Sequence, residues 1–245
     1  MSRQATRPPS ARPGLLDGRA LVLAGIVLSA FNLRTAVTSL TPLLDSLGQV
    51  FGFGATMTGV LGMLPSAAFA VFGVATPAIA HRIGLERTAL LSMLLAAAGL
   101  VMRSLAGGTG GLLLGSIVAL AGMGIGNVVL PPLVKRYFAD RVGTLSTLYI
   151  TVLQLGTILP ALVAVPAAAA VGWRISMGAW ALVAIAAALP WSMVLLVERR
   201  KESELARCHD AAVGTAIRPG SAGPGTARAR RTAAAGQWSA ARRGG

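Results

Sequence analysis

Arg34 is the residue whose type and position most directly suggest chemistry, because it lies inside an apolar stretch that runs from Ala20 to Leu44. A cationic side chain near the middle of a bilayer costs about 2.5–3.5 kcal/mol on insertion scales, and it usually marks a pathway for a ligand or an ion. The planar guanidinium presents a fork of N–H donors that suits an oxyanion or another small planar anion. All 8 acidic residues lie at the ends of apolar stretches or outside them, so we expect the counter-ion of Arg34 to come from elsewhere, for example from a substrate. The alternative is a structural arginine that binds backbone carbonyls or extends to the interface.

Other polar residues could complete such a site. Helical periodicity places those of the first stretch on two nearly opposite faces, with Arg34, Thr38 and Thr41 on one and Asn32, Thr35 and Ser39 on the other. A segment that is polar on two sides is expected inside a helix bundle. Further along, Asn127 lies in a glycine-rich stretch, and Gln154 shares a helix face with Thr147 and Thr151. We predict that Arg34 binds a substrate and that supporting polar contacts come from Asn32, Thr38, Asn127 and Gln154. The polar residues of the later stretches could equally form hydrogen bonds between helices.

Side chains that could perform catalysis or bind a metal do not fall in the apolar stretches. His81 and His209 are the two histidines, and both lie outside these stretches. The single cysteine, Cys208, cannot form an internal disulfide. The sequence also lacks the motifs of metalloproteases, serine hydrolases and phosphate-binding loops. We therefore expect no enzyme, no catalytic residues, no metal site and no cofactor.

The composition is that of a membrane protein. Of the 245 residues 54% are hydrophobic and only 12% are charged, with a mean hydropathy of +0.69, whereas soluble chains carry about 25% charged residues. The net charge of +14 comes from short segments between apolar stretches, which indicates membrane loops and not a nucleic-acid surface. The apolar stretches approach the roughly 20 residues that cross a bilayer. They predict an all-α polytopic bundle with six transmembrane helices, at 20–44, 57–80, 88–106, 112–134, 143–170 and 175–197.

The basic residues predict the orientation of these spans. With the N-terminus inside, the inner segments hold twelve basic residues and the outer segments hold two, Arg103 and Arg174. An excess of Lys and Arg on the cytoplasmic side is the rule for membrane proteins. We therefore predict a multi-pass protein of the plasma (inner) membrane with both termini in the cytoplasm. Gly122 and Gly126 allow close helix packing, and Pro131 and Pro132 are expected to bend or end the fourth span.

The chain divides into three parts by composition. Residues 1–19 are polar and basic and predict a disordered cytoplasmic leader, and residues 20–201 form the transmembrane domain. Residues 202–245 are rich in Ala, Gly and Arg, and we expect them to be disordered because they cannot bury a core. Such a composition is also typical of GC-rich DNA read out of frame. A basic tail that touches anionic lipid is the other interpretation.

Several segments together resemble the major facilitator superfamily, and within it the cyanate / 2-nitroimidazole transporter group. The segments that carry the resemblance are 32–44 (NLRTAVTSLTPLL), 80–87 (AHRIGLER), 126–131 (GNVVLP), 134–143 (VKRYFADRVG) and 172–174 (GWR). The resemblance covers about residues 20–200 and implies a gating loop that contains Arg82, Gly84 and Arg87. Two positions depart from the family pattern. His81 replaces the usual Asp of the loop, and Thr35 replaces a frequent Pro.

The resemblance implies a secondary active transporter that works by alternating access on a small anion or a small polar solute, similar to cyanate. Members of this family have twelve spans in two halves, with the substrate site between the halves near the middle of the membrane. The six spans here correspond to the N-terminal half, which suggests a truncated or frameshifted chain. A homodimer or a separate second half could complete the site. The alternative function is that of a non-transporting six-helix membrane protein, either an inactive half-transporter or a subunit that needs a partner chain.

Overall fold

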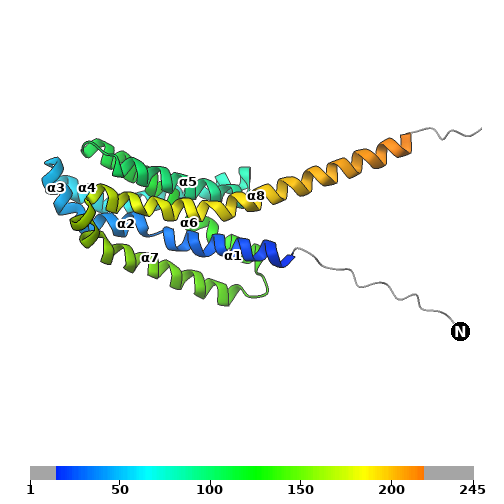
Figure 1. The fold of residues 1–245 in the computed structure, drawn as a ribbon, viewed down its shortest axis with the longest axis horizontal. Coiled ribbons are helices and arrows are strands. Elements are labelled where there is room, and N and C mark those ends of the chain that lie inside the picture. The colour runs from blue at the N-terminus through cyan, green and yellow to red at the C-terminus, as the bar shows by residue number, and fades with distance from the viewer. Residues whose placement is uncertain (1–14, 218–245) are drawn as a thin grey trace, which may run out of the picture. The chain divides into compact units, whose positions relative to one another are not determined.

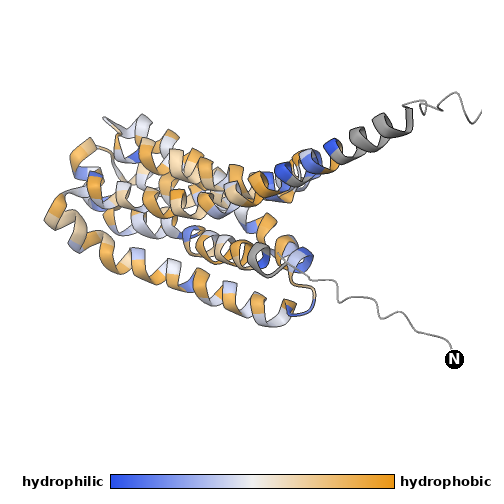
Figure 2. Ribbon diagram, turned by 45° about the vertical axis from the view of Figure 1, so that its right-hand side comes forward, coloured by the Kyte–Doolittle hydropathy of each residue, from blue (hydrophilic) through white to orange (hydrophobic). Residues whose placement is uncertain are grey.

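The computed structural model describes residues 15–217, and residues 1–14 and 218–245 lie outside the described part. Within it, the secondary structure consists of helices. In chain order these are α1 (Leu15–Asn32), α2 (Thr35–Leu40), the 3-10 helix η1 (Thr41–Leu43), α3 (Leu44–Phe51), α4 (Ala55–Ile83), α5 (Leu85–Ser104), α6 (Thr109–Tyr137), α7 (Val142–Val171) and α8 (Trp173–Ile217) (Figure 1). Among the described residues, 6 helical segments are long and apolar enough to cross a membrane, and hydrophobic residues dominate them along their length (Figure 2). The predicted all-α architecture with six spans is confirmed.

Each predicted span coincides with a helical segment, and most of the helices extend further than the apolar stretches, whereas the third span, predicted to end at 106, ends with α5 at Ser104. α1 begins at Leu15, inside the predicted leader, and α3 carries the first span on to Phe51. α8 continues to Ile217, so helix is present where the predicted tail begins at residue 202. The rest of the leader and of the tail lies outside the described residues. Hydropathy marks the part of a helix that suits lipid, whereas the polar turns at each end carry no such signal.

Glycine and proline have different effects on these helices. α4 and α5 meet at Gly84, which has a φ of 91°, and α7 and α8 meet at Gly172, which has a φ of 86°. Residues with a Cβ rarely adopt this backbone conformation, so glycine permits an abrupt change of direction. By contrast, α6 runs through Pro131 and Pro132 to Tyr137. The expectation that this pair could end the fourth span is wrong, because packed membrane helices tolerate proline when neighbouring groups satisfy the freed carbonyls.

The first span is broken beside Arg34. α1 ends at Asn32 and α2 begins at Thr35, with Leu33 and Arg34 in a turn. Three threonine hydroxyls donate to the carbonyl oxygen four residues earlier, Thr35 to Phe31 at 3.2 Å, Thr38 to Arg34 at 3.0 Å and Thr41 to Val37 at 2.9 Å. Such bonds compete with the helix ladder and bend helices. Pro42 adds the 3-10 turn of η1, because proline lacks the N–H that a regular helix needs.

Small residues let α5 and α6 pack closely. A Cβ added to Gly99 of α5 would lie 2.1 Å from the backbone nitrogen of Ala119, and one added to Gly122 of α6 would lie 2.5 Å from that of Ala96. Such distances leave room for a hydrogen atom only, so the two backbones touch. The predicted packing role of Gly122 is thereby supported. α4 also packs against α6, while α7 runs alongside α1 and α2 (Figure 1).

The contacts at the two ends of the bundle differ in character. At one end Arg19 of α1 forms an ion pair with Asp140 and lies over the ring of Phe138. At the other end Phe51 and Trp173 stack edge to face with centroids 5.4 Å apart. The basic segments between spans thus gather at the first end, as the charge pattern predicts.

Residues up to Val197 form one compact unit, and the chain from Glu198 onward forms a second. In the second unit α8 continues, and the hydroxyl of Ser203 donates to the carbonyl oxygen of Arg200 at 2.8 Å. All the residues predicted for the substrate site belong to the first unit.

Candidate functional site

The break in the first span lies between close approaches from α6 and α7. A Cβ added to Gly126 of α6 would lie 2.5 Å from Cδ2 of Leu33, and one added to Gly156 of α7 would lie 2.0 Å from the carbonyl oxygen of Phe31. The two glycines therefore let both helices touch the chain on either side of the break. Asn127 follows the first glycine, and Gln154 precedes the second by two residues. The segments that carry these predicted residues thus converge where Arg34 is placed.

Arg34 itself is exposed on the surface of the six-helix unit. The structure gives its side chain no hydrogen bond or ion pair to any described residue. Its neighbours Leu33 and Thr35 are buried, so the turn directs adjacent side chains to opposite sides. Arg34 therefore presents a free guanidinium on the flank of the bundle, whereas the sequence suggested a cation enclosed among helices.

The other predicted contacts divide between the surface and the core. Gln154 is exposed and Asn127 is half-buried, with its amide donating to the carbonyl oxygen of Met123 at 3.0 Å. The hydroxyl of Thr38 lies 3.0 Å from the carbonyl oxygen of Arg34 and 3.5 Å from that of Gly156. Thr38 thus links the broken span to α7.

Asn32 lies on the opposite face and is fully buried. Its amide nitrogen is 3.7 Å from the sulfur of Met93 on α5, and its amide oxygen has no hydrogen-bond partner among the described residues. The side chain is directed into the core behind the break and not towards the surface that displays Arg34. The predicted two faces of the first span are therefore present, and Asn32 is on the inner one.

A second arginine, Arg103, is the buried cation of this unit. It is 0% exposed and donates from Nη1 to the carbonyl oxygen of Ala36 at 2.8 Å and from Nη2 to the hydroxyl of Ser39 at 3.1 Å. Arg103 lies in the last turn of α5, and its side chain turns inward into the bundle, which the sequence analysis did not predict. A signal existed in the sequence. Helical periodicity places Arg103 on the stripe of small residues formed by Ser92, Ala96 and Gly99.

The predicted loop between the second and third spans is reduced to Gly84 between α4 and α5, and the residue there that other helices engage is Glu86 in the first turn of α5. Arg82 and Arg87 are exposed, while Glu86 is 5% exposed. Arg136 places Nη1 3.2 Å from one carboxylate oxygen of Glu86, and the hydroxyl of Tyr137 donates to that oxygen at 2.9 Å. The loop is thereby tied to the end of α6. Sequence reasoning named the basic residues and missed the acid, although an acid in the first turn of a helix is a favourable position.

Asp140 carries the remaining ion pairs at this end. Its own backbone N–H, together with Arg19 and Arg141, holds the pKa of its carboxyl below the ordinary range, and partial desolvation acts in the opposite direction. Both arginine contacts are at the surface, with Asp140 55% exposed, so salt will screen them.

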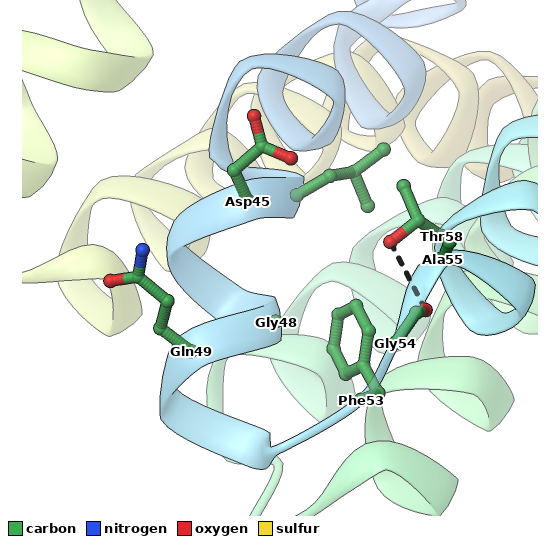
Figure 3. A pocket seen from close by; sticks show the side chains of 8 residues that line it. Asp45, Gly48, Gln49, Phe53, Gly54, Ala55 and Thr58 are labelled. Carbon is green, nitrogen blue, oxygen red and sulfur yellow. Dashed lines mark hydrogen bonds between the residues drawn. The ribbon is translucent and has the colours of Figure 1, made fainter.

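An open pocket of about 710 Å³ lies at the other end of the bundle. Residues of α3 and of the start of α4 line it, and Figure 3 shows the side chains of Asp45 and Gln49 projecting from α3 away from Phe53. At about 1.5 Å per residue, Asp45 is roughly 40 Å along the first span from Arg19, which exceeds the hydrocarbon thickness of about 30 Å. This carboxylate therefore belongs to the interface and not to the membrane interior.

Comparisons with known proteins agree with this architecture. A family model described as Major Facilitator Superfamily matches residues 23–243. An uncharacterized transporter of Bacillus subtilis, YycB, is 34% identical over 172 residues, which are 69% of this chain and 42% of the relative. The 2-nitroimidazole transporter of Escherichia coli is 34% identical over 158 residues, which are 64% of this chain and 40% of the relative. The cyanate transport protein CynX of Escherichia coli is 29% identical over 175 residues, which are 69% of this chain and 44% of the relative.

Solved structures show the same fold at low sequence identity. A peptide transporter POT crystallised with sulfate superposes with a TM-score of 0.64 at 15% identity, covering 80% of this chain and 45% of that one. The chain thus spans less than half of the length of the curated relatives it matches. It is a multi-pass membrane protein whose relatives are transporters of small molecules. The chain belongs to the Major Facilitator Superfamily.

Proposed function

We propose that this chain provides one half of a secondary transporter for a small anion, similar to cyanate, and that Arg34 binds the substrate. The observation that carries the proposal is the exposed guanidinium of Arg34 within the membrane-spanning part of the chain, with no carboxylate bonded to it among the described residues. A cation in that position is costly in lipid alone. A bound anion would lower this cost. The names of two relatives, a cyanate transport protein and a 2-nitroimidazole transporter, support a small polar substrate.

The neighbouring side chains suggest how the site would work. Arg34 would supply the charge, and Asn127, Gln154 and Thr38 would add polar contacts from α6, α7 and α2. Asn32 would not touch the substrate with its side chain, because that side chain is buried in the core. It would act by holding the backbone at the break in place. In alternating access the two halves of such a transporter rock about a site between them. The loop with Arg82, Gly84 and Arg87 would control the inner side, where Glu86 fastens it to α6.

We further propose that the protein lies in the plasma (inner) membrane with both termini in the cytoplasm. The uneven distribution of basic residues supports this orientation, because the predicted outer segments hold only Arg103, which is buried in the bundle, and Arg174. Arg174 is also engaged locally. It donates to the carbonyl oxygen of Ala106 at 3.1 Å and lies over the ring of Trp173.

A second candidate is a six-helix subunit that acts only with another half, either a second copy or a separate chain. The uneven burial of the spans favours it. In α4 only 11% of the most apolar window is buried in the described structure, and in α7 22%, against 67% in α6. Faces of α4 and α7 are thus uncovered on the unit that displays Arg34. If the chain is instead an inactive half-transporter, lipid would cover these faces of α4 and α7.

Uptake of labelled cyanate by proteoliposomes that contain the purified chain tests the proposal. Arg34→Ala and Arg34→Lys should both lose most of the uptake, because lysine keeps the charge but not the planar fork. Arg141→Ala provides a matched control, since it removes an exposed cation outside the spans. Uptake at the level of empty liposomes for the wild-type chain would favour the partner-dependent candidate, which cross-linking of two tagged copies then tests. Unchanged uptake in both Arg34 variants would refute the binding role.

A further inference from the structure

Arg103 is a positive charge that the bundle encloses without a counter-charge. Its two hydrogen bonds go to neutral oxygens, those of Ala36 and Ser39, and its Nε has no acceptor among the described residues. None of the ion pairs in the described part of the chain involves it. A buried charge without a partner is strongly unfavourable, and its remaining N–H groups are costly when no acceptor is present.

A small cavity adjoins this guanidinium. Its volume is about 100 Å³, and Arg103 forms part of the wall together with residues of α2, η1, α3, α4 and α6. The rest of the wall is apolar except for Thr41, whose hydroxyl already donates to the carbonyl oxygen of Val37. One water molecule needs only about 10–15 Å³ of such space, so the cavity is large enough for a dehydrated ion of a few atoms.

We propose that this cavity binds a small, weakly hydrated monovalent anion, of the size of thiocyanate, cyanate or nitrate, as the counter-ion of Arg103. The single cation of the wall matches one negative charge. Sulfate or phosphate would leave charge and acceptors unsatisfied against the apolar remainder. The bound anion would accept from Nε, the donor that lacks a partner. It would also stabilise the guanidinium that holds α2 through Ala36.

This site is separate from the one proposed at Arg34. Arg103 bonds Ser39, which is buried on the inner face of the first span, whereas Arg34 is exposed. The cavity adjoins the open pocket at the end of the bundle that holds Asp45, since Leu44 lines both. Anion binding at Arg103 therefore requires neither transport nor Arg34, and either proposal can fail alone.

The unfolding temperature of the purified chain in detergent, measured as sodium thiocyanate replaces sodium gluconate at constant ionic strength, tests the inference. A ligand that binds only the folded state raises this temperature in a saturable way. Arg103→Met removes the charge. Gly62→Leu adds a side chain at the cavity wall, where a Cβ meets no atom within 4 Å, and Gly59→Leu is its control, since Gly59 is equally open but does not line the cavity.

An anion bound at Arg34 would also raise this temperature, so the variants are made in an Arg34→Met background. In that background we expect the parent chain and Gly59→Leu to show the saturable rise. Arg103→Met and Gly62→Leu should show an apparent dissociation constant at least tenfold higher. If Arg103→Met does not fold, the comparison of Gly62→Leu with Gly59→Leu decides alone. A wild-type chain without a saturable rise would overturn the inference, and so would an equal rise in Gly62→Leu. If the wild type shows a rise in unfolding temperature and Arg34→Met abolishes it, the anion binds at Arg34. That result would support the proposed function and would refute the second site at Arg103.

Discussion

The guanidinium of Arg103 donates to the carbonyl oxygen of Ala36 at 2.8 Å, two residues beyond Arg34 in the broken first span. One arginine is enclosed and the other is exposed, and α2 lies between them. The buried arginine thus holds the short helix that follows the exposed one. The bond from Thr38 to Gly156, the close contact of α7 at Gly156 and this arginine together hold the chain around Arg34.

Gly156→Ala should destabilise the protein, because the added Cβ would lie 2.0 Å from the carbonyl oxygen of Phe31. Overpacking of this kind costs about 1–3 kcal/mol and would push α7 away from α1. The unfolding temperature in detergent measures the effect. Gly59→Ala is the matched control, since a Cβ there meets nothing within 4 Å, and it should be neutral or slightly stabilising because alanine favours helix. Equal stability of the two variants would contradict the close contact.

Glu86→Ala should lower the free energy of unfolding by about 1–3 kcal/mol, because the hydroxyl of Tyr137 and the guanidinium of Arg136 lose their shared acceptor. Glu86→Gln should cost less, since its amide oxygen can still accept from Tyr137. Arg87→Ala removes an exposed charge in the same turn and should change the value by less than about 0.5 kcal/mol. A chemical denaturation series on the three variants compares them, and an Arg87 effect as large as that of Glu86 would contradict this assignment.

The Arg19–Asp140 ion pair should weaken at acid pH. The pKa of Asp140 is lowered in the folded state, so its contribution to stability is fully present above the unfolded-state pKa of about 3.9. That contribution is lost as the pH falls through the lower folded-state pKa. The difference in unfolding temperature between the wild type and Asp140→Asn should therefore be small, present at pH 6 and absent in strong acid or at high salt. A difference that grows as the pH falls would have the wrong sign for this carboxyl.

The native thiol of Cys208 should report the orientation of the chain. A maleimide that cannot cross membranes should label it in inside-out vesicles and not in intact cells, because both termini are predicted to be cytoplasmic. Gly107→Cys in a Cys208→Ser background places a thiol between α5 and α6, in open space, and should show the reverse pattern. Labelling of Cys208 from outside intact cells would reverse the proposed orientation.

The sequence predicts the spans well because lipid demands long apolar helices, and every predicted span coincides with a helical segment of the structure to within a few residues at its ends. It also predicts two polar faces for the first span, since Asn32, Thr35 and Ser39 are buried and Arg34 and Thr41 are exposed. The break at Arg34 was not predicted. It lies where α6 and α7 touch the chain at Gly126 and Gly156, and hydropathy contains no information on such tertiary contacts.

The role of Arg103 is the clearest case of what the sequence leaves open. It lies near the end of the predicted third span and just before a glycine-rich loop, so the sequence analysis counts it with the outer segments. Its partners, Ala36 and Ser39, are more than 60 residues away in the chain, and only the tertiary packing of the bundle brings them together. Glu86 is similar, since its burial depends on α6.

The central claim is that Arg34 binds a small anion, and the rate at which a nearby thiol reacts tests it most directly. Thr38→Cys in a Cys208→Ser background places that thiol one helical turn after Arg34, and its alkylation is followed with and without cyanate. The account predicts that cyanate slows the reaction several-fold, that Arg34→Met abolishes this protection, and that Gly62→Leu retains it. Two results would contradict the assignment of Arg34 as the substrate-binding residue. One is that cyanate slows the alkylation equally in the Arg34→Met background, and the other is that cyanate does not slow it in a chain that takes up cyanate.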